Sequence, residues 1–291
     1  IFRVRENLSN KKLALIIEAD QGFIRNTEKD SNFTAENNIL FTGLTETYIP
    51  LLNMFRRLEE ENISFKMGLV MSPALCFLLD DAQIQKQYID HLDALTALGK
   101  SELKRCKGSS LEALAAEHLA KIEQTKIDFT ETYGQNILAA FKEYADKGFV
   151  ELIPTAATYA YLPHFEDFPE AISAQVETGS YSHRHFFGET GEGFWLAYQA
   201  WSKGFEWTLR SYGANYTVVD ARSILFAKDR PDTGIYAPLR TRTSLVVFGL
   251  DPDCPKELTG DDGFAQNDVY RSQRHDIGYE LKQGQVSAFF Q

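Results

Sequence analysis

The sequence lacks the features that mark membrane-spanning, secreted and disulfide-rich proteins. No apolar run approaches the ~20 residues that a membrane-spanning helix needs, and the first residues contain no signal-peptide apolar core. Its three cysteines, Cys76, Cys106 and Cys254, are far apart and form no C-x-x-C pair, so we predict neither a disulfide framework nor a zinc knuckle. These absences favour a reduced, cytoplasmic setting without membrane association.

Basic residues are also few. The 291 residues include 41 acidic and 30 basic side chains, a formal net charge of −11 at pH 7. This negative net charge disfavours nucleic acid as a partner, whereas the binding of a neutral sugar does not depend on it. The sequence has no H-E-x-x-H motif, P-loop or G-x-S-x-G elbow. The pair His183 and His185 has no third ligand nearby and is interpreted as a helix-end or surface feature, so we expect no metal ion and no cofactor.

Strand-like and helix-like patterns alternate along the chain. The predicted strands cover 13–17, 65–71, 150–153, 216–219 and 245–248. The predicted helices cover 45–60, 168–178 and 205–212, with Trp207 at core spacing in the last one. Polar residues follow several strands, which is typical of a parallel α/β sheet or barrel. The helical pattern from about 83 to 147 is too long for one crossover helix and indicates a helical insertion.

Several segments share their order with the motifs of a known family. They include LALIIEADQGFIR (13–25), TETYIPLL (45–52), MSPAL (71–75), ELIPTAATYAYLPHF (151–165), GFWL (193–196) and YRSQRHDIGY (270–279). Together they resemble glycoside hydrolase family 57, in its α-amylase and 1,4-α-glucan branching-enzyme branch. The resemblance implies a (β/α)7-type barrel over residues 13–291, including the insertion at about 83–147, after an N-terminal extension of residues 1–12. It also implies that the C-terminal part of the family fold is missing from this chain.

The resemblance places changed residues where the family does its chemistry. Glu18 and Asp20 stand where the first motif has two histidines, and Tyr159 stands at another histidine position. Tyr198 stands at the position of the nucleophilic glutamate, and we find no copy of the segment that carries the acid/base aspartate. Because retaining glycoside hydrolysis needs two carboxyl groups, the resemblance implies a catalytically degenerate protein.

The changed residues leave several roles open. Tyr198 either fills space, stacks on sugar, or acts as a nucleophile with Glu18 as its base. Glu18 and Asp20 share one face of a strand, and Asp220 ends another strand. At a barrel mouth these carboxylates form either a new acid/base pair, a divalent-cation site or a solvated rim. The candidate sugar-binding residues are Trp195, Tyr159, Tyr198 and Phe23.

Three functions follow from these patterns. The first is a degenerate family 57 protein of starch or glycogen metabolism that binds α-glucan, a malto-oligosaccharide or a partner. The second is an active glucan hydrolase or branching glycosyltransferase with a relocated or split active site, in which a second polypeptide completes the barrel. The third is a non-catalytic scaffold module. The sequence leaves the enzymatic status open, and the substitutions lead us to expect an inactive protein.

Overall fold

Two parallel sheets carry the fold. The computed structural model describes residues 12–25, 35–260, 263–267, 269 and 281–282, and the YRSQRHDIGY segment (270–279) lies outside them. The first sheet has the order β1 (Ile16–Ala19), β2 (Met67–Met71) and β3 (Val150–Ile153). The second has the order β4 (Gly193–Trp195), β5 (Tyr216–Val219), β7 (Val246–Gly249) and β6 (Leu239–Arg240). All neighbouring strands are parallel except β6, which pairs with β7 in the antiparallel sense.

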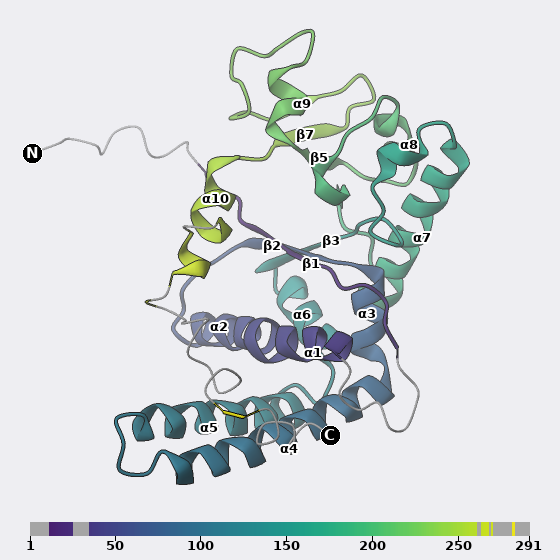
Figure 1. The fold of residues 1–291 in the computed structure, drawn as a ribbon. Helices are drawn as coiled ribbons and strands as arrows, with labels where there is room; N and C mark the ends of the chain where they lie inside the picture. The colour runs from purple at the N-terminus through teal and green to yellow at the C-terminus, as the bar shows by residue number, and fades with distance from the viewer. Residues whose placement is uncertain (1–11, 26–34, 261–262, 268, 270–280, 283–291) are drawn as a thin grey trace, which may run out of the picture.

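Helices cover the outer faces of the two sheets. Below the first sheet in Figure 1 lie α1 (Ala35–Gly43), α2 (Ile49–Glu60), α3 (Pro73–Asp80) and α6 (Ile137–Asp146). Near the second sheet lie α7 (Pro169–Phe187), α8 (Phe205–Ser211) and α9 (Ala221–Leu225), with α10 (Asp253–Thr259) following β7. The π-helix η2 (Leu44–Tyr48) joins α1 to α2, and short 3₁₀ turns are η4 (Leu162–Phe165), η5 (Ala197–Gln199) and η6 (Phe264–Gln266). None of the helices in the described part of the chain combines the length and the apolar character that crossing a bilayer requires.

Strands β2, β4 and β5 are buried on both faces along nearly their whole length, which explains their largely apolar sequences. In β2, Leu69 and Met71 belong to the core between the sheet and the helices below it, while Val70 points to the opposite face of the sheet. There Val70 packs in an inner cluster built from both sheets: Ile153, Trp195 and Val218, with Ile16, Tyr159 and Leu250 against them. Because strands from both sheets each contribute a side chain, this cluster is the packed interior of a barrel-like fold.

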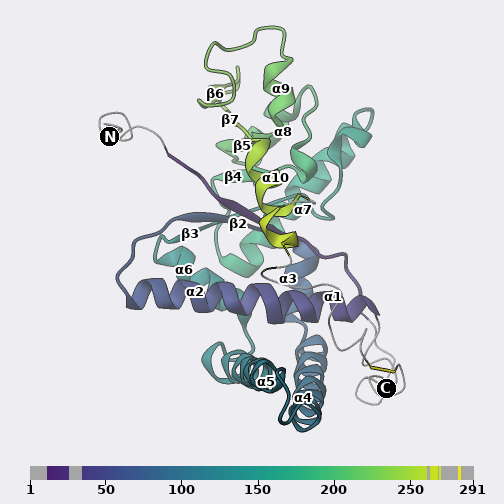
Figure 2. The same ribbon diagram turned by 60° about the vertical axis from the view of Figure 1, so that its left-hand side comes forward.

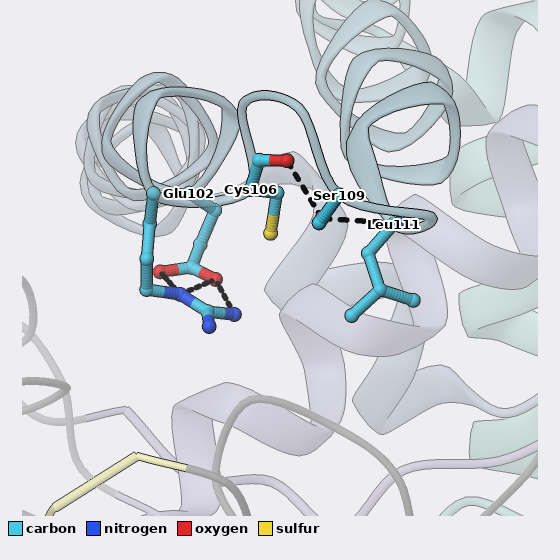
Figure 3. A network of polar contacts seen from close by, with 5 residues as sticks. Glu102, Cys106, Ser109 and Leu111 are labelled. Atoms are coloured by element: carbon cyan, nitrogen blue, oxygen red, sulfur yellow. Dashed lines mark hydrogen bonds and ion pairs between the residues drawn. The ribbon is translucent and has the colours of Figure 1, made fainter.

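A helical hairpin projects below the first sheet and its helices. The stretch expected to be helical holds α4 (Ala82–Arg105), α5 (Glu112–Ile127), the π-helix η3 (Asp128–Thr132) and α6, and Figure 2 shows α4 and α5 side by side. Figure 3 shows the turn at its tip, where the Ser109 hydroxyl donates to the Cys106 carbonyl (2.7 Å) and accepts from the Leu111 N–H (3.2 Å). Glu102 and Arg105 form an ion pair beside it. The Lys-Gly-Ser-Ser sequence at 107–110 thus ends one helix and allows the next to begin.

One prediction about the core is wrong. Trp207 was predicted to be buried, but 66% of its surface is exposed. In α8 the buried positions are Phe205 and Leu209, which are four residues apart and therefore share one helix face. Trp207 lies halfway between them in sequence and so projects from the opposite side.

Buried histidines should make the stability of the fold depend on pH. Burial lowers the pKa of His91 from 6.5 to about 4 and also lowers the pKa of His183, whose Nδ1 is hydrogen-bonded to the Glu189 carbonyl (2.8 Å). The unfolded chain binds protons near pH 6.5 but the folded chain does so only at lower pH. The free energy of unfolding is therefore at its full value above pH 6.5 and falls as the pH drops through the window from 6.5 to 4.

For His91 the loss should amount to about 2–3 kcal/mol by pH 4.5. Urea unfolding at pH 7 and pH 4.5 measures it, with His91→Gln as the comparison because glutamine does not titrate. We expect the variant to lose less stability between the two pH values than the unmodified protein. An equal loss in both proteins would contradict the assignment.

Candidate functional site

Three chain segments meet beyond the C-terminal ends of β1, β3 and β4. Glu18 lies on the same face of β1 as Ile16, so its side chain points toward the mouth of the barrel. The indole Nε1–H of Trp195, which is 4% exposed, donates to Glu18 Oε2 (2.7 Å) and also lies 3.3 Å from the Tyr159 hydroxyl oxygen. The buried indole N–H is thus satisfied by a carboxylate, and the carboxylate is fixed from below by a rigid ring.

Tyr159 completes this hydrogen-bonded group from the loop that follows β3. Burial raises the pKa of the Tyr159 phenol, and the hydrogen bond to Glu18 and the charge of that carboxylate raise it further. Tyr159 therefore stays protonated and donates to Glu18. Its backbone has φ 52°, the left-handed region that a bulky side chain rarely occupies.

Tyr198 and Gln199 form the upper rim in η5. Both residues have left-handed φ angles, 58° and 52°, and 68% of the Tyr198 surface is exposed. The Tyr198 ring centroid lies 6.3 Å from that of Tyr159 and 6.2 Å from that of Tyr161. We call Tyr159, Tyr161 and Tyr198 the tyrosine cluster. Gln199 Nε2 reaches within 3.4 Å of Glu18 Oε2, so the rim and the carboxylate are connected.

Such backbone angles are informative because each left-handed non-glycine residue costs on the order of 1–3 kcal/mol. The structure holds the two rim residues in place from below, since the Gln199 carbonyl accepts the Asp220 N–H (3.0 Å). The consequence of the left-handed turn is that the Tyr198 ring projects into solvent instead of packing into the barrel.

The other two carboxylates predicted for the mouth have different environments. Asp220 caps α9 by accepting the Arg222 N–H (2.8 Å) and forms an ion pair with the Arg222 guanidinium (2.8 Å), which lowers the pKa of Asp220. Asp20 follows β1 and is exposed. Its charge contributes to the raised pKa of Tyr48, about 12, for which burial is the larger cause, and it is also the smallest of the causes that raise the pKa of Tyr159. Within the described residues, no three His, Cys, Asp or Glu side chains are grouped so that they could hold a metal ion.

The structure also places the remaining predicted residues. Phe23 lies in the loop after β1 and is 60% exposed. Among the described residues, Glu18 accepts hydrogen bonds from Trp195, Tyr159 and Gln199 rather than from the Tyr198 hydroxyl.

Sequence reasoning missed two members of the site, Tyr161 and Gln199. Each lies within two residues of a predicted position, Tyr159 or Tyr198, so the motif that pointed to the neighbours contained them. What the sequence did not show is the backbone turn that brings each of them to the mouth.

Close backbone packing fixes the floor of the site. The Thr155 hydroxyl donates to the Trp195 carbonyl (2.9 Å), and α7 approaches so closely that a Cβ on Gly179 would lie 2.0 Å from the Thr155 carbonyl oxygen. Only glycine permits this approach. The ends of β3 and β4, which carry the Tyr159 loop and Trp195, are thereby held in register.

The fold corresponds to that of a known protein family. Residues 14–256 match glycosyl hydrolase family 57, and the chain belongs to this family. The crystal structure of the α-amylase AmyC from Thermotoga maritima superposes with a TM-score of 0.89 at 28% identity, covering 96% of this chain and 53% of that one. The predicted family 57 fold is thereby confirmed.

A branching enzyme from the same family is also similar. The 1,4-alpha-glucan branching enzyme TK1436 of Thermococcus kodakarensis is 27% identical over an alignment of 212 residues that covers 68% of this chain and 30% of that enzyme. Its crystal structure in complex with glucose and additives has a TM-score of 0.80 at 23% identity, covering 91% of this chain and 52% of that one, and shows a likeness of fold. The chain thus spans about half of the similar structures and less than a third of the curated relative.

Removal of the Glu18 carboxylate should be visible at Trp195. In Glu18→Ala the indole N–H loses its charged acceptor, so its ¹H resonance should move upfield and the free energy of unfolding should fall by about 1–3 kcal/mol. Because the chain has three tryptophans, the indole region of a ¹H–¹⁵N spectrum is simple to assign. Asp20→Ala is the matched control and should leave this resonance in place. If Asp20→Ala shifts the resonance as far as Glu18→Ala does, the described hydrogen bond is wrong.

Proposed function

We propose that the protein belongs to α-glucan metabolism and binds α-glucan at the mouth formed by Glu18, Trp195 and the tyrosine cluster. The observation that carries the proposal is the tyrosine cluster itself, an exposed ring flanked by two others within 6.3 Å. Proteins similar to this chain include an α-amylase and a 1,4-α-glucan branching enzyme, two kinds of enzyme that are named for their action on α-glucans. Support for glucan as the ligand therefore comes from the family and from the chemistry of the mouth.

Tyrosine rings suit this ligand because a sugar has an apolar C–H face and a polar edge. A ring such as Tyr198 offers an apolar surface for the first and a hydroxyl at its tip for the second. Beside it, Glu18 is a carboxylate whose Oε2 is engaged by protein donors. A carboxylate has acceptor capacity for several donors, so Glu18 can also accept hydrogen bonds from sugar hydroxyls.

We further propose that the mouth does not cleave glucan by the family's retaining mechanism. That mechanism needs a carboxylate nucleophile and an acid/base carboxyl group about 5–5.5 Å apart. Tyr198 stands at the position aligned with the nucleophile, and Asp220 is engaged with Arg222. The Glu18 carboxylate accepts hydrogen bonds from Trp195, Tyr159 and Gln199, and no second carboxylate is placed beside it among its described hydrogen-bond partners.

Residual hydrolase or transferase activity is the second candidate, and the position of the Glu18 carboxylate in the mouth favours it. The scaffold role stays a prediction. So does the second polypeptide that is expected to complete the barrel. The cytoplasmic setting is also a proposal, supported by free thiols at Cys76, Cys106 and Cys254.

Calorimetric titration with maltoheptaose tests glucan binding. We expect saturable heat from the unmodified protein and at least tenfold weaker binding by Tyr198→Ala, because the variant loses the central ring of the cluster. Tyr181→Ala is the matched control, since Tyr181 is as exposed as Tyr198 but lies on α7. Equal binding by both variants would show that the mouth is not the glucan-binding site. The absence of saturable heat from the unmodified protein would also contradict the proposal.

The same titration, followed for hours, tests the loss of catalysis. We expect the heat to stop after binding and no new reducing ends to form. Sustained heat that disappears in Glu18→Gln would instead establish a working enzyme with a relocated carboxylate. Glutamine keeps the size and acceptor oxygen of Glu18 but cannot exchange a proton at neutral pH.

A further inference from the structure

A second concave site lies between α1, η2 and α4, built from residues that do not belong to the mouth. The cavity has a volume of about 330 Å³. We call it the α1–α4 cavity, and its lining residues are Asn38, Thr42, Thr45, Glu46, His91 and Leu95. Thr42 and Glu46 are exposed at its rim, while His91 is buried, so the cavity has an open side and a floor.

We propose that the α1–α4 cavity binds a neutral polyhydroxy molecule about the size of one hexose. The volume lies at the lower end of the roughly 300–1,000 Å³ found for small-molecule sites. The lining offers an amide, two hydroxyls, an imidazole and a carboxylate, a mixture of donors and acceptors that matches hydroxyl groups. Leu95 supplies an apolar wall for a C–H face. Because the lining formed by the described residues includes a carboxylate and no Lys or Arg, it does not suit a phosphate or another anion.

An unmet hydrogen bond supports the proposal. The Asn38 side-chain oxygen is buried and has no hydrogen-bond partner among the described residues. A buried acceptor of this kind costs about 1–3 kcal/mol when it is left unsatisfied. A hydroxyl donor bound in the cavity would supply the missing partner.

The backbone of the cavity wall is also unusual. Thr45 and Glu46 belong to the π-helix η2, which is inserted between α1 and α2. Short π-helical segments are rare and occur frequently at functional sites. The Thr45 hydroxyl shares a 2.9 Å hydrogen bond with the Tyr88 hydroxyl of α4, which fixes the distance between the two walls. The π-turn thus places two polar side chains opposite His91 on a wall of fixed position.

NMR titration of the isotopically labelled protein with D-glucose tests the assignment. We expect glucose to shift the Asn38 side-chain amide resonance saturably. Thr42→Val keeps the shape of the rim but removes a hydroxyl, so it should weaken the binding at least tenfold. Thr96→Val is the matched control, because the Thr96 hydroxyl on α4 is also buried without a described partner but does not line the cavity. This control should bind within twofold of the unmodified protein.

Further titrations separate this site from the mouth. Maltoheptaose is too long for the cavity and should leave the Asn38 resonance in place, and Tyr198→Ala should retain the glucose response. The proposal is overturned if the response is lost in Tyr198→Ala but kept in Thr42→Val, since the sugar then binds at the mouth. It is also overturned if roughly 100 mM glucose, far above a millimolar dissociation constant, gives no saturable shift. Neither result depends on whether maltoheptaose binds at the mouth.

Discussion

The backbone pairing of β3 with β4 joins the two sheets, and both the core and the mouth depend on it. The Trp195 N–H donates to the Pro154 carbonyl (2.8 Å), and Thr155 bridges to Trp195 in the parallel sense. The same tryptophan sends its ring into the inner cluster and its indole N–H to Glu18. A single residue thus joins two sheets, fills the interior and sets the position of the carboxylate at the mouth.

Much of the fold could be predicted because strand and helix patterns are local. The limits of β3 and β5 agree with the predicted strands, since each is a short apolar run beside a turn or polar residue. Helix α3 is not among the predicted helices, because it follows directly on the strand predicted for 65–71 and proline stands at its start. In the structure the pair Ser72-Pro73 begins this helix, with the Ser72 hydroxyl accepting the Leu75 N–H (3.3 Å) and proline in the first turn.

The mouth was less accessible to sequence reasoning. The order of the motifs brought Glu18, Tyr159 and Trp195 into one hypothesis, and the structure places them in hydrogen-bonding contact. The environment of Asp220 could not be read in the same way, because its partner Arg222 is supplied by the start of a helix that no pattern marked. Side-chain direction at a strand end depends on the turn that follows, and turns of this kind have no sequence period.

An acidic protein has to accommodate its carboxylates, and Asp128 and Glu18 illustrate how neutral donors do this here. Asp128, 2% exposed, accepts from Asn53 Nδ2 (2.7 Å) and Gln124 Nε2 (3.0 Å), which ties η3 and α5 to α2. Glu18 is held in the same manner by an indole, a phenol and an amide. Neutral donors stabilise the negative charge without cancelling it, so the charge remains available to a ligand.

The left-handed turn at Tyr198 and Gln199 has a consequence for how this chain can change over evolutionary time. Glycine at either position would relax the backbone and raise stability, and random substitution would tend to find it once the mouth had no task. The chain instead carries a bulky aromatic residue and a long polar one, each in a conformation that opposes folding. These two adjacent residues lower the stability of the fold, and they face solvent or Glu18. If the surface had no function, substitution would be expected to replace such destabilising residues.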